Sequence, residues 1–174
     1  WSRILIAIPN AVLFVKDKNF GDKLVRESFC CRFEFHGISR NRLILEGASP
    51  RLEYLKAYNR VDIALSPFPY GGGTTSVEGL WMGVPAITIK GSHFLSHLGE
   101  SIAHNAGLSD WIASDEEEYV AKAIAFSADL DSLARLRSRL REQVLSSPLC
   151  DAKRFANNFE TALREMWEIK SSLY

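Results

Sequence analysis

The sequence has little cysteine and no excess of charge of either sign. Its 174 residues include three Cys, and 21 Lys and Arg balance 21 Asp and Glu, so the formal net charge at pH 7 is zero. A neutral chain without a block of like charges is a poor match for a protein that binds nucleic-acid phosphates or an anionic membrane surface. We therefore expect neither nucleic acid nor a membrane among its partners.

Patterns that hold a metal or form disulfides are also scarce. Cys30 and Cys31 are adjacent, and the sequence has neither a CxxC pair nor a Cys/His spacing typical of zinc. His93 and His97 lie four residues apart, but HExxH requires Glu after the first His, and Phe94 follows it here. We expect free thiols in a reduced cytoplasm and no metal cofactor; for the two histidines, surface or acceptor-cleft positions are favoured over a metal site.

Long apolar runs are missing as well. No run approaches the ~20 residues of a membrane span, and the start does not have the layout of a signal peptide. The sequence opens on Trp1, not on an initiator Met, and an apolar segment follows at once. We therefore expect the chain to be part of a longer, cytoplasmic protein.

The first two-thirds of the sequence alternate between short apolar runs and amphipathic stretches. This alternation is typical of βαβ units around a parallel sheet. The segment Ile4 to Ile8 is ambiguous, because five consecutive apolar residues fit either a buried strand or the end of a buried helix. The predicted strands are 11–15, 43–45, 61–65 and 86–89, and the predicted helices are 23–35, 51–60 and 75–82.

Beyond residue 96 the pattern becomes helical. Apolar residues recur at helical spacing over 97–105, 116–127, 132–145 and 152–170. The acidic run Asp115 to Glu118 suits a helix N-terminus, and Asp151 could cap the last helix. We predict a single α/β domain over 1–174, with βα units over 1–95 and a mainly helical part over 96–174.

The segment from Asp62 to Pro85, DIALSPFPYGGGTTSVEGLWMGVP, carries the clearest chemical signal. A predicted strand runs into three consecutive glycines, then Thr74, Thr75 and Ser76 at the start of a helix. Glycines let a ligand approach the backbone, and a helix N-terminus offers unpaired N–H groups and a favourable dipole for an anion. The pattern favours a phosphate or diphosphate site, while a flexible turn with a Thr helix cap is the alternative.

Two common phosphate motifs do not fit this loop. A Walker A loop needs Gly-Lys before Ser or Thr, and GxGxxG started at Gly71 would need glycine where Ser76 stands. Glu78 lies one helical turn after the threonines, so its carboxylate can point back toward the same end of the helix, where the anion site is expected. There it suits a ribose hydroxyl pair, or it is simply a favourable charge in the first turn of the helix.

At the level of whole blocks, the sequence resembles the O-GlcNAc transferase family, including its bacterial tetratricopeptide-linked members and the SPINDLY branch. The blocks that carry the resemblance are SPFPYGGGTTSVEGLWMGVPAIT, the opening WSRILIAIPNAVL, GISRNRLILEGASPRLEYLKAYNRVDIAL, SSPLCDAKRF and the closing ALREMW. Nearly the whole chain is covered, in the family's order and spacing.

The resemblance implies a fold and a set of donor contacts. The fold is the C-terminal, Rossmann-like half of a GT-B glycosyltransferase, a three-layer α/β domain with a parallel sheet and a helical C-terminal tail. It also implies that Ile4 to Ile8 closes a helix and that no metal is needed. The implied contacts are Gly73, Thr74 and Thr75 with the donor diphosphate, Glu78 with the ribose, and Ser49, Pro50 and Arg51 with the base.

The sequence departs from the family pattern at four positions in or near these contacts. Tyr54 and Gly73 stand where histidines are frequent, and Ser66 and Gly71 stand where Asp and Asn are frequent in LD-x-FPYNG. The family's Gln and Lys that contact donor and leaving group precede the segment matching Trp1. No catalytic residue is therefore assigned within this chain, and Tyr54 is noted only for its position.

The expected function is the donor-binding half of an inverting transferase that moves N-acetylglucosamine from UDP-GlcNAc to Ser or Thr of a protein acceptor. We expect the last helix to dock on an N-terminal catalytic half, with tetratricopeptide repeats further upstream, and the isolated fragment to be inactive. Two alternatives stay open. One is the same fold with GDP-fucose or a glycan acceptor, and the other is a degenerate, non-catalytic nucleotide-binding module.

Overall fold

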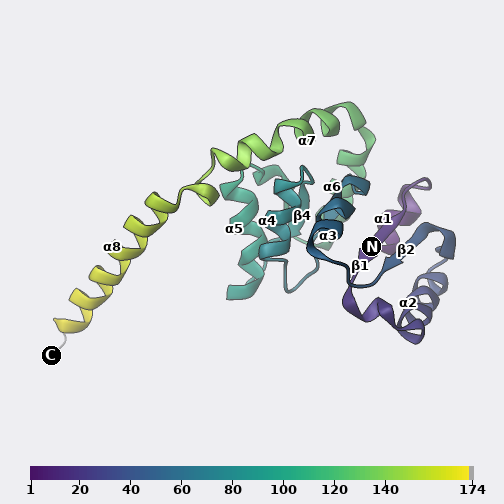
Figure 1. The fold of residues 1–174 in the computed structure, drawn as a ribbon, viewed down its shortest axis with the longest axis horizontal. Helices are drawn as coiled ribbons and strands as arrows, with labels where there is room; N and C mark the ends of the chain where they lie inside the picture. Colours follow the sequence, from purple (N-terminus) through teal and green to yellow (C-terminus); the bar gives the residue numbers. More distant parts are fainter. Residues whose placement is uncertain (173–174) are drawn as a thin grey trace.

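The computed structural model describes residues 1–172; residues 173 and 174, which the expected domain includes, lie outside the described part. Helices and short parallel strands alternate from the N-terminus to β5, and three helices follow (Figure 1). The strands are β1 Leu13–Lys16, β2 Leu43–Glu46, β3 Ala64–Leu65, β4 Ala86–Ile89 and β5 Ile112–Ala113. The helices are α1 Ser2–Ala7, α2 Lys23–Phe35, α3 Arg51–Ala57, α4 Thr74–Trp81, α5 His97–Asn105, α6 Glu116–Ala128, α7 Leu130–Leu145 and α8 Ala152–Ser171.

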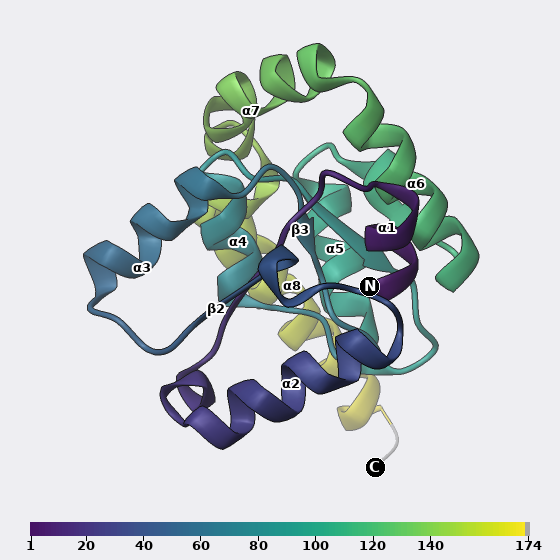
Figure 2. The ribbon, with the colours of Figure 1, turned by 90° about the vertical axis from the view of Figure 1, so that its right-hand side faces the viewer.

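All strand pairs in residues 1–172 are parallel. β1 pairs with β2, in the register Leu13 with Leu43, and β3, β4 and β5 form a second group in that order. A helix connects each strand to the next, because parallel neighbours need a crossover. Helices α3 and α4 lie on one side of the strands, and α1 and α6 lie on the other (Figure 2). The prediction of a Rossmann-like α/β fold is confirmed.

Helix starts follow the sequence signals closely. Asp115 caps α6 through its side chain, which accepts a hydrogen bond from the N–H of Glu118 at 2.8 Å, and Asp151 caps α8 in the same way through Arg154. The cap at Asp151 was predicted from the sequence, whereas Asp115 was predicted only as part of an acidic run at a helix N-terminus. At the end of α4, Gly83 has φ +79°, and a Cβ there would lie 2.9 Å from the carbonyl oxygen of Arg137. Glycine is therefore required where the chain turns into β4.

Three details differ from the sequence prediction. The first strand begins at Leu13, two residues later than predicted, and it ends at Lys16. The strand predicted over 61–65 is reduced to Ala64 and Leu65, the two residues that pair with Ala86 and Ile87 of β4. Strand β5 was not predicted. The ambiguous segment at the start is helical, as α1 covers Ser2–Ala7.

The core is formed by the β3–β4–β5 strands with the helices around them, and a smaller cluster lies beside β1. Leu80, Ile87, Leu140 and Val144 are almost completely buried in the larger cluster. The Arg141 guanidinium stacks over the Trp81 ring at 4.4 Å from its centroid, which ties α7 to α4. This contact and the buried core hold α4, and with it the loop that precedes α4, in place.

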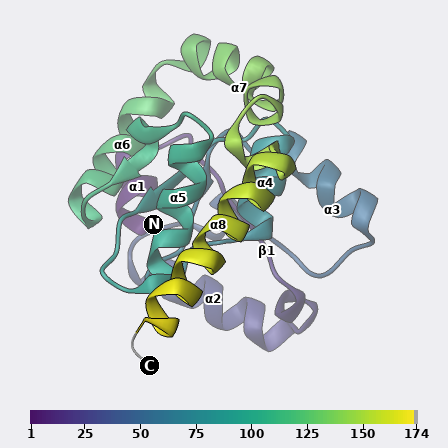
Figure 3. The same ribbon diagram turned by 90° about the vertical axis from the view of Figure 1, so that its left-hand side faces the viewer.

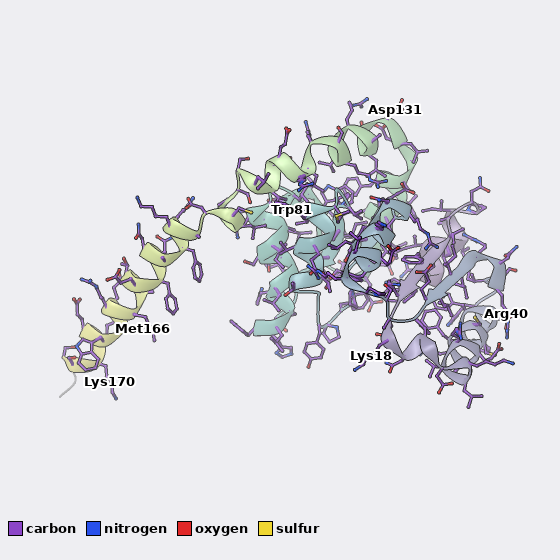
Figure 4. The ribbon with its side chains drawn as sticks, viewed as in Figure 1. Lys18, Arg40, Trp81, Asp131, Met166 and Lys170 are labelled. Carbon is purple, nitrogen blue, oxygen red and sulfur yellow. The ribbon has the colours of Figure 1, made fainter. Side chains whose placement is uncertain are left out.

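The last helix, α8, is not part of this core. Helix α8 extends away from the other elements, and Met166 lies far out on it (Figures 1, 3 and 4). None of its described residues is buried. Its exposed apolar residues are Phe155, Phe159, Leu163, Met166, Trp167 and Ile169.

Candidate functional site

The glycine-rich loop between β3 and α4 is closed by a hydrogen bond of its own. The Ser76 hydroxyl donates to the carbonyl oxygen of Gly72 at 2.8 Å. A Cβ on residue 72 would lie 2.6 Å from the Ser76 hydroxyl and 2.8 Å from that of Thr75. The Ser76 hydroxyl, which follows the two threonines in the sequence, is therefore not a free donor for a ligand, because its proton is used inside the loop.

The first turn of α4 keeps donors available. Gly73 is the N-cap and makes no side-chain capping bond, so the alternative of a Thr cap is also wrong. The N–H groups of Ser76 and Val77 bond to the Gly73 carbonyl, whereas those of Thr74 and Thr75 have no protein partner within residues 1–172. Both threonines are exposed. Two N–H groups and two hydroxyls therefore face solvent at the positive end of the helix dipole, where an anion is favoured.

Residue 73 also has free space around it. A Cβ built on Gly73 would have no heavy atom within 4 Å. The space around the residue therefore does not require glycine here. A ligand or a larger side chain has room at this point beside Thr74.

The predicted ribose and base contacts lie side by side. Glu78 comes from α4 and Arg51 from the first turn of α3, and Arg51 Nη1 donates to Glu78 Oε1 at 2.5 Å. The Glu78 side chain is only 12% exposed, whereas that of Arg51 is 68% exposed. Glu78 is thus fixed in a mostly buried position, and Arg51 approaches it from the solvent side.

Two tyrosines complete this cluster. The Tyr54 hydroxyl donates to Glu78 Oε2 at 2.9 Å and lies 2.9 Å from the Tyr58 hydroxyl, which contacts the carbonyl oxygen of Thr75 at 3.0 Å. Burial raises the pKa of the Tyr54 hydroxyl, and its hydrogen bonds to Tyr58 and Glu78 raise it further; burial also raises the pKa of Tyr58. Both hydroxyls therefore keep their protons at neutral pH.

The remaining predicted base contacts precede α3. Pro50 is its N-cap, and Ser49 lies directly before it, on the segment that follows β2. The Ser49 hydroxyl oxygen is buried and has no hydrogen-bond partner among the described residues. A buried hydroxyl without a partner is costly, so a ligand group that bonds Ser49 would remove this cost.

Ser66, where the family often has Asp, occupies a buried position under the loop. Its hydroxyl likewise lacks a partner within the described chain, while its carbonyl accepts from the buried Tyr119 hydroxyl at 3.0 Å. A cavity of only about 10 Å³ adjoins it, lined partly by Ser76 and Thr88. Ser66 is therefore buried beside Ser76 and Thr88, and it does not lie with the exposed threonines.

The two histidines weighed as metal ligands have other contacts. His97 Nδ1 lies 2.7 Å from Glu100 Oε2, and Lys90 Nζ lies 3.3 Å from Glu100 Oε1. The backbone of His93, not its ring, bonds to Ser96: its N–H lies 3.0 Å from the Ser96 hydroxyl oxygen, and its carbonyl accepts from that hydroxyl at 2.6 Å. Across residues 1–172, no group of three or more His, Cys, Asp or Glu side chains is arranged to hold a metal. In the same range, no helix has both the length and the apolar character to cross a membrane.

The structure thus brings together Arg51, Glu78 and the first turn of α4, which were predicted from separate blocks of sequence. Tyr58 was missed as a member of the cluster. Its spacing of four residues from Tyr54 places both on one helix face, but the same spacing is equally typical of ordinary packing.

Parallel strands, a glycine-rich loop before a helix and an acidic residue one turn later define an α/β domain of the Rossmann-like class. Comparison with known proteins specifies it further. The profile of glycosyl transferase family 41 matches residues 1–159, and the chain belongs to this family.

The relatives agree with this assignment. The chain is 41% identical over 171 residues to Probable UDP-N-acetylglucosamine peptide N-acetylglucosaminyltransferase SPINDLY of Petunia hybrida, covering 96% of the chain and 18% of that protein. It is 25% identical to the UDP-N-acetylglucosamine peptide N-acetylglucosaminyltransferase of Caenorhabditis elegans, over 97% of the chain and 14% of that protein. The chain therefore spans less than a fifth of the length of these curated relatives.

A solved structure is similar over the same range. A variant of Thermobaculum terrenum O-GlcNAc transferase superposes with a TM-score of 0.90 at 36% sequence identity, covering 96% of this chain and 32% of the other. The predicted family and fold are both confirmed. The roles of individual site residues stay predictions.

Proposed function

We propose that this chain is the donor-binding half of an inverting glycosyltransferase, which transfers N-acetylglucosamine from UDP-GlcNAc to Ser or Thr hydroxyls of proteins. One observation carries the proposal: the Arg51–Glu78 pair lies beside the open first turn of α4 with Thr74 and Thr75. A nucleoside diphosphate needs this combination, a polar nucleoside site next to an anion site. The names of the relatives support UDP-GlcNAc as the donor.

In the proposed reaction the acceptor hydroxyl attacks the anomeric carbon, and the bond to the diphosphate breaks with inversion. Negative charge then grows on the leaving diphosphate. The N–H groups and hydroxyls of Thr74 and Thr75 are fixed at the positive end of α4, so they stabilise this charge without rearranging. Arg51, Ser49 and Pro50 hold the base, and Glu78 accepts hydrogen bonds from the ribose.

The chemistry needs a second half that supplies the acceptor side of the cleft. The relatives are much longer than this chain, which supports an N-terminal catalytic half and tetratricopeptide repeats in the complete protein. The apolar face of α8 is suited to pack on that half. We place the complete protein in the cytoplasm, which agrees with the free thiols of Cys30, Cys31 and Cys150.

Calorimetric titration with UDP tests the diphosphate site. The Thr74→Ala/Thr75→Ala variant should bind UDP at least tenfold more weakly, because each lost bond to a charged group is worth about 1.5–3 kcal/mol. Ser138→Ala, which removes an exposed hydroxyl on α7, is the matched control and should bind as the wild type does. No binding at millimolar UDP, or unchanged binding by the double variant, would refute the assignment. A second expectation is that the 174 residues alone transfer no sugar.

A second candidate rests on Tyr54 and Gly73, which replace two frequent histidines of the family. It is a domain of the same fold that takes GDP-fucose or a glycan acceptor, or that binds a nucleotide without catalysis. Thermal shifts measured with UDP, GDP and their sugars separate the donors, since the true donor should give the largest rise in the unfolding midpoint. A complete protein that neither hydrolyses nor transfers any nucleotide sugar would favour the non-catalytic module.

A further inference from the structure

Behind the carboxylate of Glu78, two tyrosine hydroxyls form a chain that the proposed reaction does not use. Tyr54 contacts Glu78 Oε2 and Tyr58 contacts Tyr54, each at 2.9 Å, and the two rings meet edge to face at 5.6 Å. The four-residue spacing puts them one above the other on the segment formed by α3 and its 3-10 extension. Both tyrosines are half-buried, and their hydroxyls lie in line with the carboxylate of the ribose candidate Glu78.

The number of hydroxyl protons decides which group donates in each of these hydrogen bonds. Two hydroxyl protons are available for three contacts, namely Glu78 with Tyr54, Tyr54 with Tyr58, and Tyr58 with the Thr75 carbonyl. An ionised carboxylate only accepts, so Tyr54 must donate to Glu78. The Thr75 carbonyl oxygen also only accepts, so the Tyr58 hydroxyl donates to it at 3.0 Å. Tyr58 therefore ties the tyrosine pair to the first turn of α4, and it supports Tyr54 through the edge-to-face contact of the two rings.

The Tyr58 ring is held against α4 by a glycine. A Cβ on Gly79, which is buried, would lie 3.3 Å from Tyr58 Cε1 and 3.7 Å from the Val84 carbonyl oxygen. The ring therefore packs directly on the helix backbone one residue after Glu78. This contact fixes the position of the tyrosine pair along α4 relative to the Glu78 carboxylate.

The two partners of Glu78 differ in how firmly they are placed. Arg51 is mostly exposed, so it can move toward an arriving nucleoside, whereas Tyr54 is half-buried and backed by Tyr58. We propose that Tyr54 is a positioning residue: its hydroxyl, supported by Tyr58, holds Oε2 of Glu78 so that the carboxylate accepts the ribose hydroxyls. This role rests on the proposed function, and it adds two residues that determine how strongly the site selects for a ribose diol.

The test compares UDP with 2′,3′-dideoxy-UDP by calorimetric titration of the complete protein that carries this chain. Tyr54→Phe should weaken UDP binding about tenfold, as expected for a lost bond to a charged group, and should change binding of the dideoxy nucleotide less than twofold. In a Glu78→Gln background, Tyr54→Phe should cause no comparable further loss. Equal losses for the two nucleotides, or no loss for UDP, would overturn the role of Tyr54.

The wild-type measurement separates this inference from the proposed function. If the wild type binds UDP more tightly than the dideoxy nucleotide and Tyr54→Phe binds both as the wild type does, only the positioning role fails. If the wild type does not bind UDP, or does not distinguish the two nucleotides, the ribose assignment fails and the role of Tyr54 fails with it. Should Tyr54→Phe not fold, Tyr58→Phe replaces it, with an expected loss of about threefold confined to UDP.

Discussion

Arg51 and Glu78 are 27 residues apart in sequence, and their side chains are joined at 2.5 Å across the gap between α3 and α4. Because the Arg51 side chain is 68% exposed, the pair should contribute at most about 1 kcal/mol to folding. The pair matters for binding, because it places the Arg51 cation beside the Glu78 carboxylate at the expected nucleoside site. We expect Arg51→Ala to lower UDP affinity about tenfold while the thermal unfolding midpoint stays nearly unchanged.

Arg135→Ala is the matched control for this prediction. Arg135 is an exposed arginine on α7, and its guanidinium donates to the Ser132 hydroxyl one turn away at 2.7 Å. Both variants lose one positive charge, so a general electrostatic effect on UDP would lower affinity equally in the two. A selective loss in Arg51→Ala supports the base site, and equal losses argue against it.

The glycine at position 72 gives a second prediction. A Cβ there would meet the hydroxyls of Ser76 and Thr75, which must rotate away. Rotation breaks the bond between Ser76 and the Gly72 carbonyl, so Gly72→Ala should destabilise the fold by about 1 kcal/mol and should also weaken UDP binding by moving Thr75. Chemical denaturation and titration measure the two effects.

Gly73→Ala is the neighbouring comparison. Its Cβ meets nothing within 4 Å, so Gly73→Ala should keep the bond between Ser76 and the Gly72 carbonyl and should destabilise the fold less than Gly72→Ala does. If the two alanine variants are equally stable, the contacts around Gly72 do not restrict the loop.

The start of α6 supplies a pH-dependent prediction. The backbone N–H of Ser114 donates to Glu118 Oε2 at 2.6 Å, and with the Ser114 hydroxyl and Lys122 it lowers the pKa of Glu118 to about 2. A lowered pKa in the folded state means that the carboxylate stabilises the fold above its unfolded pKa, near 4.5, and that this contribution is lost as the pH falls through about 2.

Glu118→Gln should therefore unfold at a lower temperature than the wild type at pH 7, and the difference should shrink between pH 4.5 and pH 2. Melting curves across this range measure it. Glu142→Gln, at an exposed position on α7, controls for the loss of one charge. A difference that is constant with pH would contradict the role of the ionised carboxylate.

The helices and strands that could be predicted from the sequence are those whose sequence signal lies within a few neighbouring residues. Asp151 was predicted as a cap and the acidic run from Asp115 as a helix start, and helices begin at both places, because a helix start is decided within about four residues. Strand β5, Ile112–Ala113, has only two residues, which is too short for any periodicity to show. Its pairing with β4 depends on the tertiary fold.

The site shows the same division. The glycines and threonines predicted an anion site from local chemistry, but the contact between Arg51 and Glu78 depends on how α3 and α4 pack. Ser76 illustrates the limit: as a residue type it suits a phosphate ligand, and only the geometry shows that its hydroxyl bonds to Gly72. Residue type alone does not say where a proton is used.

Helix α8 gives the last prediction. Phe155, Phe159 and Leu163 follow one another at intervals of four residues, so they share a face, and none is buried within this chain. Burying a side chain such as Phe159 on the N-terminal half would stabilise the complete protein by about 1.5–3 kcal/mol. Phe159→Lys should therefore lower the unfolding midpoint and the transferase activity of the complete protein but leave the midpoint of the 174-residue chain nearly unchanged. Thr161→Lys, on the opposite face, should affect neither; equal effects of the two lysines would mean that the apolar face does not dock.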